Sequence, residues 1–198
     1  ANGADGANGA DGAGVNKYST ALTADTYLST GSTASTATTT SSGLYPATLN
    51  LTDTMENVGS VVTRGSVTYN RNASATATGS RFTVAVAGRY KIDYFATYNV
   101  TAASASANSV TLNMGIYYST DSGSTWSALQ TQSAAFSTAS TSTAQTTLEL
   151  SKTVFLPANT LIEFKASRGT SDVNTVVTVN AVTKSEVGDD TFVVITKL

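Results

Sequence analysis

From Leu44 onward, short runs of β-branched and aromatic residues alternate with polar residues, and clusters of Gly, Asn, Asp and Ser separate the runs. This pattern is typical of strands, and no stretch has the 3.6-residue period of an amphipathic helix. The expected strands are residues 45–51, 60–70, 81–87, 89–100, 109–119, 125–137, 144–156, 160–167, 173–183 and 190–198. About ten short strands in one small domain predict an all-β fold, an antiparallel sandwich, jelly roll or barrel.

The segment GRYKIDYFATYNV illustrates the alternation. Side chains in a strand point to the two faces in turn. One face carries Tyr90, Ile92, Tyr94, Ala96 and Tyr98, and it is expected to be buried. The opposite face carries Lys91, Asp93, Phe95, Thr97 and Asn99. Because Phe95 lies beside Lys91 and Asp93, this mixed face is also expected to meet something, for example another subunit.

Glycine recurs at every third position near the start of the chain, at Gly3, Gly6, Gly9 and Gly12. A collagen triple helix requires this spacing, because only Gly fits at the axis of three chains. Residues 1–14 are therefore expected to form a short collagen-like Gly-X-Y stem, provided that a trimer downstream holds three chains together. A solvated linker is the alternative.

Residues 15–43 are dominated by Ser, Thr and Ala. Such a segment buries little apolar surface, so a linker, a stalk or an irregular wrap is expected there. The sequence thus divides into a stem at 1–14, a Ser/Thr-rich linker or stalk at 15–43 and a β-rich head at 44–198.

The residues that the chain lacks restrict its chemistry. It contains no Cys and no His, which excludes Ser-His-Asp and Cys-His catalysis, thiolate metal sites and most zinc sites. The net charge is −2 and only 12% of residues are charged, which argues against a nucleic-acid partner. No apolar run approaches the roughly 20 residues of a bilayer span, so membrane insertion is not expected.

The segment SVTYNRNASATATGSRFTVAVAGRYKIDYFATYNV resembles the C1q/TNF-like jelly roll. The matching positions are Gly79, Phe82, Val84, Gly88, Tyr90 and Ile92. The later segments LELSKTVFLPANTLIEFKAS and DDTFVVITKL look like the late pair of strands and the closing strand of that family. The resemblance covers about residues 44–198 and implies a homotrimer, with Lys91, Asp93 and Phe95 on a possible trimer-interface face.

Heads of this kind commonly sit on a collagen-like stem, so the glycine spacing and the jelly-roll resemblance agree. Together they resemble phage and viral fibres or spikes, and also surface fibres of bacterial spores.

The segment STDSGSTW matches the Asp-box of sialidases through Ser119, Asp121, Gly123 and Trp126. One interpretation is a glycan-processing enzyme. The motif is itself a β-hairpin turn, in which Asp accepts backbone N–H bonds and Gly adopts a positive φ. Because one copy is present where those folds carry repeats, the hairpin turn is favoured. Tyr117, Tyr118 and Trp126 could stack on a sugar, or they could pack inside the domain.

The carboxylates Asp93, Glu149, Glu163 and Asp189 fall on different expected strands, and none of their pairs is indicated as catalytic. Asp189 and Asp190 could bind Ca²⁺, a cation that prefers oxygen ligands. No EF-hand-like spacing accompanies them, so solvated loop charge is favoured. No catalytic residue, cofactor or metal site is expected.

These observations predict a non-enzymatic homotrimeric fibre, spike or decoration protein on the surface of a phage or virus particle. It would attach to a host glycan or protein receptor by multivalent binding, and its N-terminal side would join a capsid or tail protein. A bacterial surface or spore-coat fibre head is the first alternative, and a glycan-processing enzyme is the second.

Overall fold

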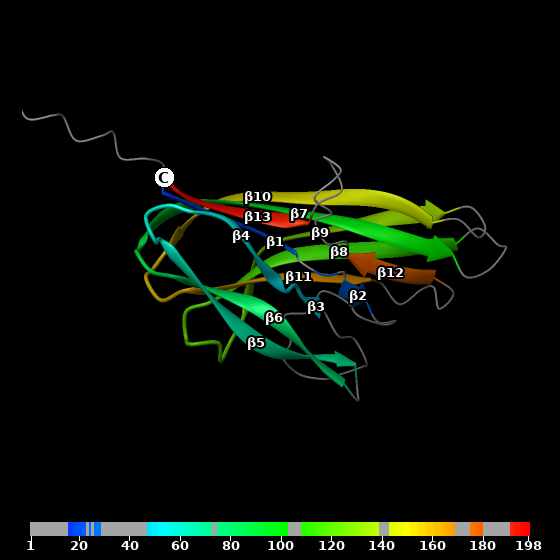
Figure 1. Ribbon diagram of the computed structural model, residues 1–198, viewed down its shortest axis with the longest axis horizontal. Helices are drawn as coiled ribbons and strands as arrows, with labels where there is room; N and C mark the ends of the chain where they lie inside the picture. The colour runs from blue at the N-terminus through cyan, green and yellow to red at the C-terminus, as the bar shows by residue number, and fades with distance from the viewer. Residues whose placement is uncertain are drawn as a thin grey trace, which may run out of the picture.

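The computed structural model describes residues 16–22, 24, 26–28, 47–72, 75–102, 108–138, 143–168, 175–179 and 191–198. Every regular element within these ranges is a β-strand (Figure 1). The expected collagen-like stem with Gly3, Gly6, Gly9 and Gly12 lies outside the described residues, and so do Asp189 and Asp190.

The described strands number thirteen. They are β1 (Lys17–Leu22), β2 (Thr26–Leu28), β3 (Ala47–Thr48), β4 (Leu51–Asn57), β5 (Val62–Asn72), β6 (Ala75–Val84), β7 (Gly88–Ala102), β8 (Asn108–Ser119), β9 (Ser127–Thr138), β10 (Thr143–Leu156), β11 (Leu161–Arg168), β12 (Thr175–Val179) and β13 (Phe192–Lys197).

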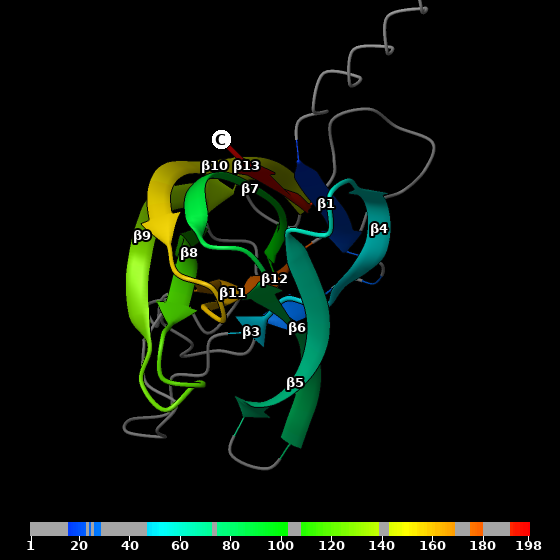
Figure 2. The same ribbon diagram turned by 90° about the vertical axis from the view of Figure 1, so that its left-hand side faces the viewer.

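The strands form two antiparallel sheets that lie face to face (Figure 2). In the first, the β7 sheet, β7 pairs along its whole length with β10. The other edge of β7 pairs with two strands: with β13 near the start of β7 and with β12 near the end of β7. The strands β1 and β4 continue the sheet beyond β13, and β2 continues it beyond β12. The second, the β11 sheet, has the order β5-β6-β11-β8-β9, with β3 beside β11.

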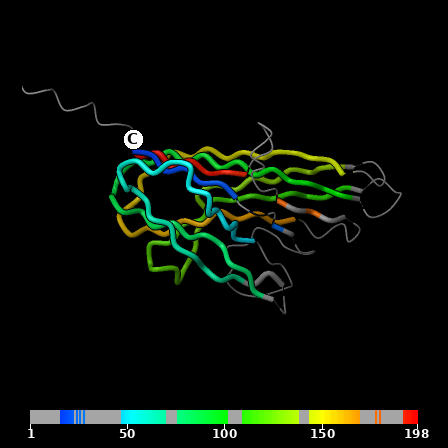
Figure 3. The backbone as a smooth tube through the Cα atoms, in the orientation of Figure 1, coloured from blue at the N-terminus to red at the C-terminus, as the bar shows by residue number. Residues whose placement is uncertain are grey.

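Eight of these strands have the order of a jelly roll. The β7 sheet contains β1-β13-β7-β10 and the β11 sheet contains β6-β11-β8-β9. Several connections therefore cross from one sheet to the other, as two Greek keys require. The backbone trace shows two of these crossings, where β6 leads into β7 and where β10 leads into β11 (Figure 3). The prediction of an all-β antiparallel jelly-roll sandwich is confirmed.

The core lies between the sheets, and the alternation in β7 was predicted correctly. Tyr90, Ile92, Tyr94, Ala96 and Tyr98 are all fully buried. Sheets in a sandwich are about 10 Å apart, and two of these tyrosines span that gap. The hydroxyl of Tyr98 donates to the carbonyl of Asn113 at 2.8 Å, and that of Tyr94 donates to the carbonyl of Lys165 at 3.4 Å. The tyrosines therefore tie β7 to β8 and β11.

The prediction of a linker or stalk at 15–43 is wrong for β1. This strand lies inside the β7 sheet, between β13 and β4. Its residues are small and polar, but the inward-facing Tyr18 and Leu22 are buried, and even Thr20 is fully covered. Pairing with β13 and β4 places the strand inside the sheet, and Tyr18 packs against Phe82 of the other sheet with ring centres 5.7 Å apart. Composition alone therefore misjudged the segment.

The hairpin of β5 and β6 also begins and ends differently from the expected strands. β6 starts at Ala75, whereas the apolar pattern predicted residue 81 as the start. The additional residues are Thr, Ala, Gly and Ser. They pair with residues of β5 across the hairpin; Thr78, for example, is opposite Thr68. Backbone pairing across the hairpin makes this part a strand, and its last two residues, Gly79 and Ser80, are also buried.

Candidate functional site

The Asp-box residues form the turn that joins β8 to β9. The hydroxyl of Ser119 donates to Asp121 Oδ1 at 2.7 Å and accepts from the amide of Gly123 at 2.9 Å. Ser122 and Gly123 have φ values of 60° and 91°, a region that favours glycine. Residues 119–126 are thus a tight turn organised around the Ser119 hydroxyl; we call this segment the 119–126 turn.

Both carboxylate oxygens of Asp121 accept hydrogen bonds from within the turn. Thr125 donates its amide to Oδ1 at 2.9 Å and its hydroxyl to Oδ2 at 2.6 Å. The hydrogen bonds from the Ser119 hydroxyl and from Thr125 hold the pKa of Asp121 well below its usual range. Hydrogen bonds to an ionised carboxylate favour the charged form. Asp121 is therefore an ionised acceptor that shapes the turn.

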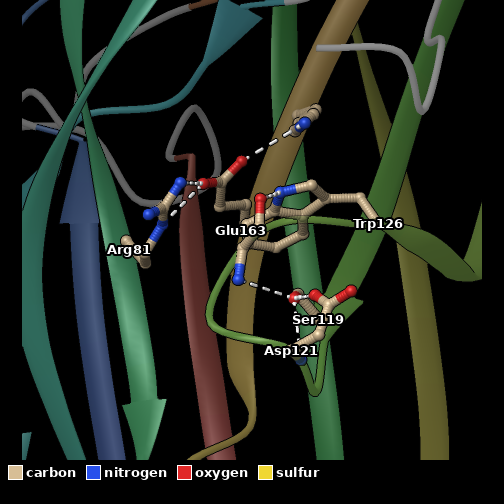
Figure 4. Close-up of polar contacts among 7 residues, drawn as sticks. Arg81, Ser119, Asp121, Trp126 and Glu163 are labelled. Atoms are coloured by element: carbon tan, nitrogen blue, oxygen red, sulfur yellow. Dashed lines mark hydrogen bonds and ion pairs between the residues drawn. The ribbon is translucent and has the colours of Figure 1, made fainter.

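Trp126 ends the turn and folds back over the outward face of the β11 sheet (Figure 4). Its indole N–H donates to the carbonyl of Gly123 at 3.1 Å, and only 8% of the residue is exposed. Its ring centre lies 5.1 Å from Arg81 Cζ and 5.3 Å from Lys165 Nζ. Cations at this distance are attracted to the face of an aromatic ring.

Beneath Trp126 lies a charged cluster of Arg81, Glu163 and Lys165. Glu163 Oε1 accepts from Arg81 Nε at 2.8 Å and from Nη2 at 2.6 Å, and Lys165 Nζ lies 3.2 Å from Oε2. The Glu163 and Lys165 side chains are only 4% and 7% exposed. One buried carboxylate therefore holds two cations, a geometry in which each charge has a partner.

The two tyrosines before the turn lie on opposite faces of β8. Tyr117 is buried, and its ring centre is 5.1 Å from Lys165 Nζ, so its ring contacts the charged cluster. Burial raises the pKa of the Tyr117 hydroxyl. Tyr118 is half-buried and faces the other way, because side chains alternate along a strand. The structure thus brings Tyr117 and Trp126 together and separates Tyr118 from them.

The second candidate surface is the outward face of the β7 sheet. Lys91 Nζ lies 2.9 Å from Asp93 Oδ2, and Asp93 also accepts from the Ser151 hydroxyl at 2.6 Å. Phe95 is directly opposite Phe192 of β13. Their rings stack with centres 4.5 Å apart and planes inclined by 18°. Both phenylalanines keep part of their surface exposed.

Sequence reasoning missed Phe192, Arg81 and Lys165 as members of these sites. One sequence signal existed: in the segment IEFKAS, Glu163 and Lys165 alternate with apolar residues, so they share one face of a strand. The partner of that face, Arg81, lies 82 positions away in the sequence. No local pattern predicts that pairing.

The remaining carboxylates do not come together at one place. Asp93 and Glu149 lie on the outward face of the β7 sheet, on neighbouring strands, while Glu163 is on the β11 sheet. Within the described ranges, no three Asp or Glu residues are grouped closely enough to hold a metal ion. The same part of the chain contains no helix that is long and apolar enough to cross a membrane.

No protein-family model matches the chain, and no curated protein matches it. Among solved structures, the chain is similar to that of the Eiger TNF from S. frugiperda. The two are 10% identical, the TM-score is 0.43, and the match covers 71% of this chain and 87% of that one. The assignment of a jelly roll therefore rests on the strand order described above.

Proposed function

We propose that this chain is the non-enzymatic head of a homotrimeric fibre, spike or decoration protein on the surface of a phage or virus particle, where it attaches to a host surface by multivalent binding. The observation that carries the proposal is the stacked pair Phe95 and Phe192 on the outward face of the β7 sheet. Two partly exposed aromatic rings on a sheet face are typical of a contact between copies.

The surroundings of the pair support a contact surface. Val194 lies beside it on β13, and the polar residues Lys91, Asp93 and Glu149 border it on β7 and β10. An apolar centre with a polar rim is the usual anatomy of a protein–protein interface. Aromatic residues in such centres contribute most of the binding free energy.

The number of copies follows from the glycine spacing in residues 1–14, because a triple helix contains three chains. A trimer of heads would hold three stems together and remove the cost of nucleating so short a helix. Three identical sites on one particle component then raise the avidity for a host glycan or protein receptor without a high affinity at any single site.

The non-enzymatic part of the proposal is supported by Asp121 and by the composition. Both oxygens of the Asp121 carboxylate accept hydrogen bonds of the turn, so they shape the backbone and are not directed at a substrate. The sequence offers no His or Cys as a nucleophile or base.

Light scattering on the purified chain tests the assembly. The unmodified protein is expected to have the mass of a trimer at micromolar concentration. Phe95→Asp places a charge in the apolar centre and should give a folded monomer. The matched control is Thr131→Asp, at an exposed position of β9 on the other sheet, and it should remain a trimer. A monomer mass for the unmodified chain would refute the proposal.

Two further measurements address attachment and chemistry. A panel of bacterial strains is screened for cells that bind the fluorescently labelled trimer. On those cells the trimer should bind at least about 100-fold more tightly than the Phe95→Asp variant. Equal binding by both would contradict multivalent attachment. Turnover of an oligosaccharide panel that Asp121→Ala abolishes would favour the enzyme instead.

A further inference from the structure

Four of the large hydrophobic residues that are exposed lie at the same end of the sandwich. We call Val58, Val86, Phe155 and Leu198 the end patch; their exposed fractions are 40%, 45%, 62% and 66%. This is the end at which β1 begins and β13 ends (Figure 1). Exposed apolar residues that cluster at one place usually mark a contact.

Phe155 and Leu198 of the end patch are joined through Arg89 on the strand between them. The amide of Leu198 donates to the carbonyl of Arg89 at 2.8 Å, and Arg89 is directly opposite Phe155. Arg89 therefore lies between Phe155 and Leu198. Val58 reaches the same end because its amide donates to the carbonyl of Lys17 at 2.8 Å.

Two cations at this end have no carboxylate partner among the described residues. Lys17 pairs with Glu56, and Lys91 pairs with Asp93. Arg89 and Lys197 form no such ion pair within the part of the chain that the structure describes. The Lys197 side chain runs past Gly88, where an added Cβ would lie 2.7 Å from its Cε. Arg89 is thus a cation without a carboxylate partner among the described residues, and it lies beside Phe155 and Leu198 of the end patch.

The chain enters the sandwich at the same place. β1 and β13 pair antiparallel, with Lys17 opposite Thr196, and Lys197 donates its amide to the carbonyl of Asn16 at 2.9 Å. One further pair in this register would place Val15, which lies outside the described residues, opposite Leu198. Residues 1–15 contain Asp5 and Asp11 but no Lys or Arg, so their charge is complementary to that of Arg89 beside the end patch.

The reach of the segment suits this contact. Asp11 precedes Asn16 by five positions, a span of at most about 17 Å in an extended chain. Arg89 is on β7, two strands away from β1, or roughly 10 Å across the sheet. The carboxylate of Asp11 can therefore reach the Arg89 guanidinium.

We propose that residues 11–15 of the chain lie across the end patch of their own copy. Val15 packs against Leu198, and the carboxylate of Asp11 pairs with Arg89. The segment also contacts Phe155, which lies beyond Arg89 on β10. The contact is made within one copy, so it goes beyond the proposed trimer and does not depend on it. Residues 11–14 would then belong to the head, and a triple helix would be limited to the residues before Asp11. It fixes the direction in which the N-terminal residues leave the head.

Hydrogen exchange of the full chain, followed by mass spectrometry, tests the contact. Amides in residues 11–15 should exchange at least about tenfold more slowly than in an unstructured peptide. Arg89→Gln and Asp11→Asn should each reduce this protection about two- to fivefold, as expected for an exposed ion pair. The double variant should lose no more than either single variant, because the two residues act as one pair. The controls are Arg64→Gln, an exposed arginine on β5, and Asp5→Asn; neither should change the protection.

Phe155→Ser provides a test that does not rely on charge. The side chain is mostly exposed, so the head should stay folded while residues 11–15 lose protection. Exchange of these amides at the unstructured rate in the unmodified protein would overturn the proposal. So would a loss of trimer mass in Phe155→Ser with unchanged protection, because the end patch would then contact a second copy. A monomeric protein that retains protection would refute the trimer and leave this contact standing.

Discussion

The guanidinium of Arg81 lies between the carboxylate of Glu163, which it contacts at 2.6 Å, and the ring of Trp126, whose centre is 5.1 Å from its Cζ. Removing the carboxylate beneath a cation held in this way is destabilising, because it leaves a partly buried charge without a partner. Trp126 is the sole tryptophan of the chain, so its fluorescence reports directly on this cluster.

We expect Glu163→Gln to lower the free energy of unfolding by about 3 kcal/mol, because it leaves the buried Lys165 and the partly buried Arg81 without a carboxylate. Urea unfolding followed by Trp126 emission and by circular dichroism measures the change. Glu56→Gln is the matched control, since the Lys17–Glu56 pair is 36% and 39% exposed. It should cost less than about 1 kcal/mol. Equal effects of the two substitutions would show that the cluster is no stronger than a surface pair.

Gly79→Ala should destabilise the head by about 1–3 kcal/mol, as overpacking does. A Cβ at Gly79 would lie 2.5 Å from the carbonyl oxygen of Thr48, and this backbone atom of β3 cannot move aside as a side chain could. Gly65 is on the neighbouring strand, and its Cβ would meet nothing closer than 3.8 Å. Gly65→Ala should therefore be neutral or stabilise by up to about 1 kcal/mol. Thermal unfolding of the two variants compares them, and the reverse order would contradict the close approach of β3.

The loss of stability of the 119–126 turn in acid should follow the protonation of the Asp121 carboxylate. Its pKa is lowered in the folded protein, chiefly by the Ser119 hydroxyl and by Thr125. Its contribution to stability is therefore complete above the unfolded value of about 4 and is lost as the pH falls below that value towards the folded pKa. Carboxyl chemical shifts from NMR should give a midpoint below that of a free Asp side chain. Asp121→Asn should remove this part of the acid response, and an unshifted midpoint would contradict the hydrogen bonds of the turn.

Tyr98→Phe should have opposite consequences at neutral and at alkaline pH. At neutral pH it removes the bond to the Asn113 carbonyl, which should cost about 1 kcal/mol. Burial raises the pKa of Tyr98 in the folded state, whereas unfolded tyrosine ionises near pH 10. The unmodified protein should therefore lose stability as the pH rises above about 10, and Tyr98→Phe should lose less. Urea titrations on both sides of that pH, with tyrosinate absorbance, measure the difference; parallel losses would show that Tyr98 does not contribute.

Local patterns were sufficient where the structure depends on neighbours in the sequence. The alternation in GRYKIDYFATYNV predicted which side chains of β7 are buried, because each residue in a strand faces opposite to the next one. Ser119 and Asp121 predicted the turn between β8 and β9 for the same reason: donors and acceptors in such a turn are only a few residues apart. The number and spacing of such runs predicted an antiparallel sandwich, jelly roll or barrel, and the resemblance to the C1q/TNF-like fold favoured the jelly roll among them.

Tertiary structure alone decided the features that join distant segments. Phe192 stacks on Phe95 from 97 positions away, and Arg81 meets Glu163 across 82 positions. β1 is buried in the β7 sheet although its sequence, KYSTAL, is mostly small and polar, because β13 and β4 cover it from both sides. Pairing between strands depends on how the two sheets fold over each other, and the order of residues within one strand carries no record of its partner. The sequence by itself determined the strands and the turn, whereas the packing of the sheets determined which side chains form the Phe95–Phe192 pair, the charged cluster and the end patch.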